Sequence, residues 1–389
     1  MKEKIGSIFK EQFGSAAQWI VRSPGRVNII GEHTDYNKGF VLPAAIDKNA
    51  WLALSLRDDD RIHLYAADLK DSYGGSLSDL KPIEPMNWPN YILGVIAQFQ
   101  KRNVVIKGLN AVLLSEVPIG AGLSSSAAIE CATAYAINLM NNAGIERIEL
   151  VKMAQKAEHE YAGVMCGIMD QFASMMGKAD HAIRLDCDSL AYDYVPLKLD
   201  GVKIVLLNTN VKHSLASSEY NTRRQECERA VALIQEKYKH VSSLRDATVA
   251  MLDECVKAKD AVAYKRGRFI VEEIARLHEA CKNLQNGDIN ALGKNMFATH
   301  DGLSKAYEVS CPELDWLVDA VRNNPAVLGS RMMGGGFGGC TINLVKEEAV
   351  EDLIKELSPA YEAAMNLKLT SYVAEIAAGT EETGEGMGR

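Results

Sequence analysis

The sequence lacks the features of several common classes of protein. Its eight cysteines are scattered, with no Cys-x-x-Cys pair and no His-rich segment, so neither a structural zinc site nor a disulfide framework is expected. No run of 18 apolar residues occurs, and the first residues, MKEKIGSIFKEQFG, lack the apolar core of a signal peptide. We therefore expect a reduced, cytoplasmic protein without a membrane partner.

Basic residues are a minority in this chain. The 43 lysines and arginines are outnumbered by 51 aspartates and glutamates, which gives a net charge of −8. This charge argues against polyanionic partners such as nucleic acid. The hydrophobic share of 47% is ordinary, but the length of 389 residues exceeds the size at which one hydrophobic core usually stops growing. Two domains are therefore predicted, over residues 1–200 and 201–389.

No linker rich in proline, glycine or serine separates these two parts. The domain boundary near residue 200 is therefore predicted from a change in the sequence pattern. An apolar run typical of a strand covers residues 202–207, and charged helical patterns follow it. The tail from Gly379 lacks apolar residues able to dock, and we expect it to be mobile.

Hydrophobic periodicity predicts helices and strands in both parts. Helices are expected over residues 2–13, 126–141, 148–162, 220–238 and 261–280. Strands are expected over residues 18–23, 26–30, 50–56, 61–66, 108–116, 202–207 and 341–345.

A segment rich in glycine and serine, PIGAGLSSSAA (118–128), lies between a predicted strand and a predicted helix. Gly120 and Gly122 allow backbone N–H groups to approach a ligand, and three serines add hydroxyls to the unsatisfied N–H groups of the helix start. Since one serine suffices for a cap, the segment favours an anion site over a plain turn with an N-cap. It matches neither a Walker loop nor the dinucleotide fingerprint.

Two acidic residues stand among apolar ones. Glu158 falls on the inward stripe of a predicted helix, where a carboxylate is costly unless it is paired or bound to metal; the alternative is an edge position that reaches solvent. Ser126 with one acid is a sparse ligand set, which suits Mg²⁺ held mainly by phosphates and water. Asp170, in CGIMDQ (166–171), is either a helix N-cap or a carboxylate that faces a cleft and accepts a proton from a substrate hydroxyl.

Two further segments gather unusual residues. GRVNIIGEHTDYNKGFVLP (25–43) begins as an apolar strand and then places Glu, His, Thr and Asp side by side at 32–35. In SRMMGGGFGGC (330–340), five glycines occupy six positions, more than a hairpin turn needs. Because Phe337 and its apolar neighbours argue against a floppy loop, we expect this glycine cluster to approach a ligand or another segment.

Several of these segments together resemble the GHMP kinases, the family of galactose, homoserine, mevalonate and phosphomevalonate kinases. Residues 25–43 resemble the galactokinase signature, residues 118–128 the phosphate-binding motif and residues 332–340 the third motif. CGIMDQ and SSEYNTRRQEC (217–227) are similar to galactokinases in particular. The resemblance implies an α+β, two-domain GHMP kinase fold. Its first domain is similar to domain 2 of ribosomal protein S5, its second is ferredoxin-like, and the active site lies in the cleft between them.

The resemblance also implies an activity: transfer of the γ-phosphoryl group of ATP to the anomeric hydroxyl of D-galactose, with Mg²⁺ as cofactor, in a monomer. By match to the family's motifs, Asp170 is the expected base, Arg26 its charge partner, and Ser126 and Glu158 the Mg²⁺ ligands. Asp170 and Arg26 are expected to meet where nucleotide phosphate meets sugar. The expected sugar contacts are Glu32, His33, Thr34, Asp35, Gly167 and Tyr220. The expected nucleotide contacts are Gly120, Ala121, Gly122, Leu123, Ser124, Ser125, Ser126 and Trp88.

Two alternatives share most of these motifs. An N-acetylgalactosamine kinase differs around the second carbon of the sugar, where Tyr36 and Tyr220 are the nearest bulky candidates. A galactose-sensing regulator binds the same ligands without catalysis, but such proteins have lost residues from the serine–alanine part of the phosphate motif. Here residues 124–128 are complete and both Asp170 and Arg26 are present, which favours an enzyme.

Overall fold

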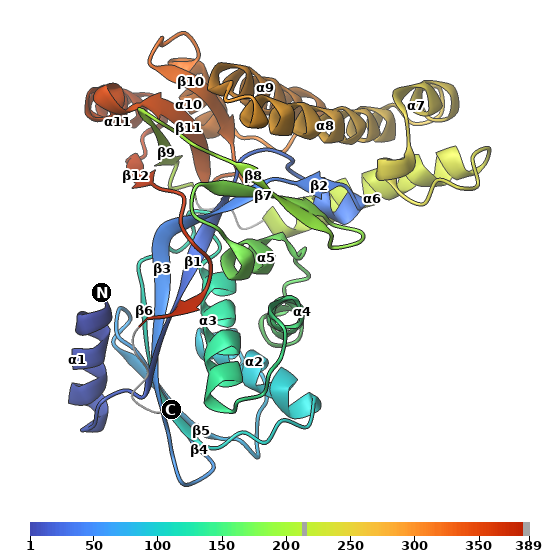
Figure 1. Cartoon of the computed structure of the whole chain (residues 1–389). Helices are drawn as coiled ribbons and strands as arrows, with labels where there is room; N and C mark the ends of the chain where they lie inside the picture. Colours follow the sequence, from blue (N-terminus) through green and yellow to red (C-terminus); the bar gives the residue numbers. More distant parts are fainter. Residues whose placement is uncertain (212–215, 384–389) are drawn as a thin grey trace.

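The structure is a computed structural model that describes residues 1–211 and 216–383 (Figure 1). Its largest sheet has six strands in the order β13-β1-β3-β6-β4-β5. Neighbouring strands pair antiparallel except β4 and β6, which are parallel. The strands are β1 (Trp19–Asn28), β3 (Pro43–Leu56), β4 (Arg61–Ala66), β5 (Asp71–Ser76), β6 (Leu109–Ser115) and β13 (Glu381–Glu382).

Helices cover both faces of the six-stranded sheet (Figure 1). Because side chains alternate along a strand, Ala53 of β3 packs against α1 (Lys2–Phe13), whereas Leu52 and Leu54 belong to the main core. The main core is closed by α2 (Pro89–Lys101), α3 (Ser125–Met140), α4 (Arg147–Ala157), the short π-helix η2 (Glu158–Ala162) and α5 (Met169–Met176). The alanine-rich α3 lies at its centre, where small side chains allow close packing against β1 and β3.

A second sheet has four antiparallel strands in the order β10-β11-β9-β12. They are β9 (Val202–Asn208), β10 (Val327–Met332), β11 (Cys340–Lys346) and β12 (Thr370–Ala374). Around them lie α9 (Ile289–Gly302), which packs on β10, α10 (Pro312–Val321) and α11 (Val350–Met365). The helices α6 (Ala216–Gln235), α7 (Val249–Cys255) and α8 (Ala261–Gln285) extend to one side of this sheet (Figure 1).

Short elements complete the structure. A three-stranded sheet consists of β2 (Phe40–Val41), β7 (His181–Asp186) and β8 (Tyr192–Pro196). The short helices are η1 (Asp35–Asn37), η3 (Leu244–Asp246), η4 (Leu303–Tyr307) and η5 (Glu347–Ala349). Within the described residues, no helix combines the length and the apolar character that crossing a membrane requires.

The predicted helices and strands are confirmed in place, although β3 begins at Pro43, well before the predicted start at residue 50. Two predicted elements differ in continuity. Residues 18–23 and 26–30 were predicted as two strands, but β1 runs through Pro24 with a change of register before Arg26. The helix predicted over 148–162 ends at Ala157 and continues as η2. The chain changes sheet between β8 and β9, near the predicted domain boundary, which itself stays a prediction.

The prediction of a mobile tail is wrong for residues 379–383. Strand β13 pairs with β1, and Arg22 Nη2 donates to Glu381 Oε1 at 2.8 Å. Thr380 is buried, with its hydroxyl 2.8 Å from that of Ser23. Polar groups and backbone bonds hold this segment, so the lack of apolar anchors was the wrong criterion. Residues 384–389 lie outside the described part of the chain.

Candidate active site

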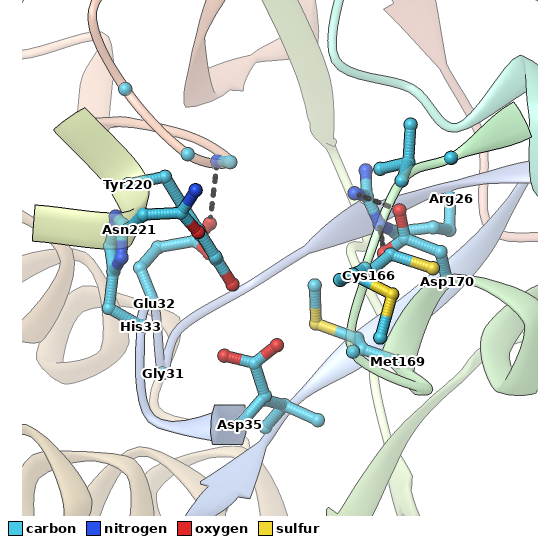
Figure 2. Close-up of a pocket in the computed structure, with 18 residues that line it drawn as sticks. Arg26, Gly31, Glu32, His33, Asp35, Cys166, Met169, Asp170, Tyr220 and Asn221 are labelled. Atoms are coloured by element: carbon cyan, nitrogen blue, oxygen red, sulfur yellow. Dashed lines mark hydrogen bonds and ion pairs between the residues drawn. The ribbon is translucent and has the colours of Figure 1, made fainter. Parts of the chain in front are cut away.

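Arg26 and Asp170 form an ion pair at the centre of the site (Figure 2). Arg26 lies near the end of β1, and Asp170 lies in the first turn of α5, which packs against β1. Arg26 donates from Nε to Oδ1 at 2.8 Å and from Nη2 to Oδ2 at 2.9 Å, the two-bond geometry that arginine favours with carboxylates. Arg26 is 5% exposed, but the Asp170 side chain is 27% exposed, so the carboxylate still reaches a ligand.

Two cavities meet at this ion pair. The larger cavity has a volume of about 480 Å³, and the loop cavity has a volume of about 260 Å³. The larger cavity is lined by residues from 31–41, 163–169 and 334–336 and by Tyr220 and Asn221. The loop cavity is lined by residues of the glycine–serine segment. Arg26 and Asp170 line both, so a group bound in one cavity meets a group bound in the other at the ion pair.

The loop cavity is formed at the start of α3. Gly120 (φ 76°) and Gly122 (φ 73°) have the left-handed conformation that glycine adopts without strain. Ser124 precedes the helix with φ 59° and makes no capping bond; its hydroxyl instead donates to Asp170 Oδ2 at 2.5 Å. The N–H groups of the first helical turn, which carry partial positive charge, therefore remain available to an anion.

Glu32 lines the larger cavity and is fixed by a fully buried arginine. Arg331 of β10 donates to Glu32 Oε1 from Nη1 at 3.1 Å and from Nη2 at 3.0 Å. The N–H of Gly334 donates to the same oxygen at 2.9 Å. Arg331 also donates from Nε to Ile29 O at 2.9 Å. Among the described residues no hydrogen bond goes to Glu32 Oε2, which leaves this oxygen to accept from a ligand.

His33 and Asp35, from the same loop as Glu32, also line the larger cavity, as Figure 2 shows. Burial lowers the pKa of His33 to about 4, so the imidazole is neutral at pH 7 and has one donor and one acceptor nitrogen. Burial raises the pKa of Asp35 to about 6, so this carboxylate is mainly ionised at pH 7 and accepts hydrogen bonds. With Glu32, these groups suit a ligand that carries several hydroxyls.

A buried pair of acids lies beside the loop cavity. Glu158 is 7% exposed, and burial, followed by the charge of Asp170, raises its pKa. Gln171 donates from Nε2 to Glu158 Oε2 at 2.6 Å and to Glu130 Oε2 at 3.1 Å. The Ser126 hydroxyl lies close enough to lower the pKa of Glu158, and Ser126 lines the loop cavity. The two predicted Mg²⁺ ligands thus lie near each other beside the phosphate loop.

The structure brings most of the predicted site residues to the two cavities. The larger cavity contains Arg26, Glu32, His33, Asp35, Gly167, Asp170 and Tyr220. The loop cavity contains Gly120, Gly122, Leu123, Ser124, Ser125 and Ser126, again with Arg26 and Asp170. The predicted meeting of Arg26 and Asp170 is therefore confirmed, and their chemical roles stay predictions.

Besides Glu158, three predicted residues line neither cavity. Contrary to the prediction, Thr34 is fully buried, and its hydroxyl donates to two carbonyl oxygens of its own loop at 3.0 and 2.5 Å. It therefore closes the turn and does not line the cavity. Ala121 is buried in the main core. Trp88 packs at the start of α2, where its Nε1–H donates to Asp71 Oδ2 at 2.8 Å, and its contact with adenine stays a prediction.

Sequence reasoning missed three contributions to the site. Glu130 is a charge in an alanine-rich helix, four residues after Ser126 and hence on the same face. Arg331 is a charge in a buried strand, three residues before the first glycine of the cluster. Both charges at buried positions were visible signals. The bond from Ser124 to Asp170 arises from the packing of α3 against α5, and no spacing in the sequence indicates it.

The fold and the phosphate loop define the class of protein. The model of the GHMP kinases N terminal domain matches residues 90–178, and that of the GHMP kinases C terminal domain matches residues 279–363. A crystal structure of mevalonate kinase shares the fold, with a TM-score of 0.66, 23% identity and coverage of 92% of this chain and 98% of that chain. The chain therefore has the fold of the GHMP kinases, and the predicted α+β fold of that family is confirmed.

Similarity within this class is more specific. The model of the galactokinase galactose-binding signature matches residues 7–56. A galactokinase of Thermotoga petrophila is 43% identical over 363 residues, 93% of this chain and 99% of that protein. The galactokinase of Bacillus subtilis is 40% identical over 387 residues, 98% and 99% of the two chains. The structure of Lactococcus lactis galactokinase complexed with galactose matches with a TM-score of 0.92 and 34% identity over 98% of this chain and 99% of that chain. The chain belongs to the galactokinase family.

Proposed function

We propose that the chain transfers the γ-phosphoryl group of ATP to the anomeric hydroxyl of D-galactose, giving galactose 1-phosphate and ADP. Membership of the galactokinase family supports a kinase that acts on galactose. One observation carries the site assignment: Arg26 and Asp170 lie where a cavity suited to a polyhydroxylated ligand meets a cavity suited to phosphate.

The larger cavity recognises the sugar through its hydroxyl groups. Glu32 Oε2 and the Asp35 carboxylate accept hydroxyl hydrogens, and His33 offers one ring nitrogen. An epimer with one hydroxyl misplaced leaves a buried acceptor unpaired, at a cost of about 1–3 kcal/mol. This cost corresponds to about ten- to a hundredfold discrimination against the epimer.

Asp170 orients the anomeric hydroxyl and accepts its proton. Phosphoryl transfer through a loose transition state needs little deprotonation before the nucleophile engages, so a fixed carboxylate suffices to orient the hydroxyl and take its proton late. Arg26 and the Ser124 hydroxyl hold Asp170 in place. Arg26 also donates from Nη1 to Gly122 O at 2.6 Å, so its positive charge lies at the phosphate loop. With the N–H groups of α3, it offsets charge on the transferring phosphoryl oxygens.

Ser126 and Glu158 would hold the Mg²⁺ that we expect with ATP. They fit such an ion because they lie near each other, with Ser126 lining the loop cavity, and because Glu158 is a carboxylate whose burial disfavours its charge, a cost that a bound cation offsets. Two protein ligands leave the remaining positions to phosphate oxygens and water. When bound, the ion neutralises part of the charge of the nucleotide phosphates.

Glu158→Gln is expected to raise the Mg²⁺ concentration that gives half-maximal rate by at least about tenfold, because it removes a charged ligand. Direct Mg²⁺ titration of the nucleotide-bound protein by calorimetry should show the same shift. Glu149→Gln is the matched control, since Glu149 is a partly exposed carboxylate on the neighbouring α4 that pairs with Arg102 and Lys152. An equal metal requirement in both variants would rule out Glu158 as a ligand.

Gly167→Ala is expected to raise KM for galactose about ten- to a hundredfold, equivalent to one buried hydrogen bond lost. A Cβ atom built at Gly167 lies 2.2 Å from Asp35 Oδ2, so the carboxylate has to move. Initial rates at saturating ATP measure the change. Gly74→Ala is the control, because a Cβ atom built there meets nothing within 4 Å; the same rise in KM in both variants would contradict this account.

Initial rates of ADP release test the proposed function. The substrates are galactose, N-acetylgalactosamine, glucose, mevalonate and homoserine, each with ATP and Mg²⁺. Galactose is expected to give the highest kcat/KM. A higher value with N-acetylgalactosamine would favour that kinase instead, and galactose binding without turnover would favour a sensor.

A further inference from the structure

A chain of hydrogen-bonded side chains runs from the larger cavity into the second half of the sequence. His33 Nδ1 lies 2.8 Å from Tyr36 Oη, and Tyr36 Oη lies 2.6 Å from Tyr307 Oη. Tyr307 Oη lies 3.2 Å from Cys227 Sγ. Tyr36 belongs to η1, Tyr307 to η4 and Cys227 to α6. Of the four residues only His33 lines the larger cavity.

Tyr307 lies in the middle of this series of hydrogen-bonded side chains and is fixed by packing and by a backbone hydrogen bond. It is fully buried, and its ring centroid lies 4.9 Å from that of His33 and 4.9 Å from that of Phe269. Its carbonyl oxygen accepts from Arg223 Nε at 2.8 Å. Tyr307 therefore has a fixed backbone, a packed ring and a hydroxyl that reaches Tyr36.

His33 needs such support because its backbone is strained. Its φ of 62° lies in the left-handed region that residues other than glycine enter at a cost. The ring of Tyr36 meets the imidazole edge-on, with the centroids 5.8 Å apart. Packing against Tyr36 and Tyr307 thus fixes the plane of the imidazole.

The hydrogen bonds also decide what His33 offers to a ligand. Nδ1 forms a hydrogen bond with the Tyr36 hydroxyl, while Nε2 is buried without a hydrogen-bond partner among the described residues. In a neutral imidazole one nitrogen donates and the other accepts, so the role of Nδ1 fixes that of Nε2. The Tyr36 hydroxyl has a single proton to share between His33 and Tyr307, and the bond to Tyr307 therefore bears on the tautomer of His33.

We propose that Tyr307 is a positioning residue of the sugar site, which acts through Tyr36 to fix the ring and the tautomer of His33. The inference rests on the proposed function, because galactose is the ligand through which it is measured. It extends the site to a residue that does not reach the cavity and that lies 271 positions from Tyr36 in the sequence.

Tyr307→Phe removes the hydroxyl and keeps the ring. We expect KM for galactose to rise about five- to tenfold, the equivalent of one hydrogen bond, with kcat and KM for ATP within about twofold of wild type. Tyr36→Phe should raise KM for galactose at least as much. Because Tyr307 acts through Tyr36, the double variant should be no worse than Tyr36→Phe alone.

Tyr361→Phe is the matched control. Tyr361 is also fully buried, and its hydroxyl donates to Thr209 O at 2.8 Å in a separate apolar cluster. Both Tyr→Phe variants should lower the urea midpoint to a similar extent, but only Tyr307→Phe should change KM for galactose. The inference is overturned if wild type is active and Tyr307→Phe behaves like Tyr361→Phe, or if its effect adds in full to that of Tyr36→Phe. Failure of the wild-type chain to turn over galactose would instead overturn the proposed function.

Discussion

Asp170→Asn is expected to lose nearly all turnover while it still binds galactose. The substitution keeps the shape of the side chain but removes the charge that Arg26 and Ser124 hold in place. Without an acceptor for the hydroxyl proton, kcat should fall about 10²- to 10⁴-fold. The Kd for galactose should change less than about tenfold, because Glu32 and Asp35 remain to accept its hydroxyls. Rates of ADP release and calorimetric titration with galactose measure the two effects.

Asp301→Asn is the control for this experiment. Asp301 accepts two bonds from Arg322, with Nη2 to Oδ1 at 3.0 Å and Nη1 to Oδ2 at 3.3 Å, and it lines neither cavity. The variant loses the same kind of ion pair and should retain its kcat. More than about a tenth of wild-type kcat in Asp170→Asn would exclude Asp170 from proton transfer.

Arg331→Met is expected to lower the free energy of unfolding by about 3–5 kcal/mol. The substitution leaves Glu32 as a buried charge without its partner and leaves carbonyl groups at the end of β1 without a donor. Since the free energy of unfolding of an ordinary domain is about 5–15 kcal/mol, this loss is a large share of the total. Urea unfolding at pH 7 measures it, and galactose affinity should fall as well because Glu32 lines the cavity.

Two further variants separate this effect from the general cost of losing an arginine. Arg268 Nε donates to Glu272 Oε1 at 2.7 Å between exposed side chains, so Arg268→Met should cost only about 0–1 kcal/mol. Combining Arg331→Met with Glu32→Gln removes the uncompensated charge and should restore part of the stability. If Arg331→Met lowers the free energy of unfolding no more than Arg268→Met does, the ion pair to Glu32 does not supply the proposed stability.

The parts of the site that the sequence predicts are those whose signal is local. The glycine–serine segment indicated a helix start open to anions, and the structure places it around the loop cavity. Arg26 and Asp170 are 144 positions apart, and no periodicity connects them. Their meeting was predicted only because two separate segments resembled motifs of one family.

The parts that were missed depend on packing between distant segments. The side-by-side placement of four polar residues at 32–35 suggested four ligand contacts, but the hydroxyl of Thr34 bonds within its own turn. Its neighbour Glu32 needs Arg331, which comes from the other sheet. Local composition shows which residues are polar, whereas the direction in which each one points depends on how the loop closes.

The position of β13 in the sequence bears on the order in which parts of the protein fold during synthesis. Besides pairing with β1 through β13, this segment bonds to the C-terminal end of α5: Thr380 Oγ1 donates to Ser174 O at 2.9 Å, and Gly379 N donates to Gly177 O at 2.8 Å. The first turn of α5 carries Asp170. These bonds can form only after residues 379–382 have left the ribosome, so the helix that carries Asp170 acquires them after residues 1–378 have been synthesised.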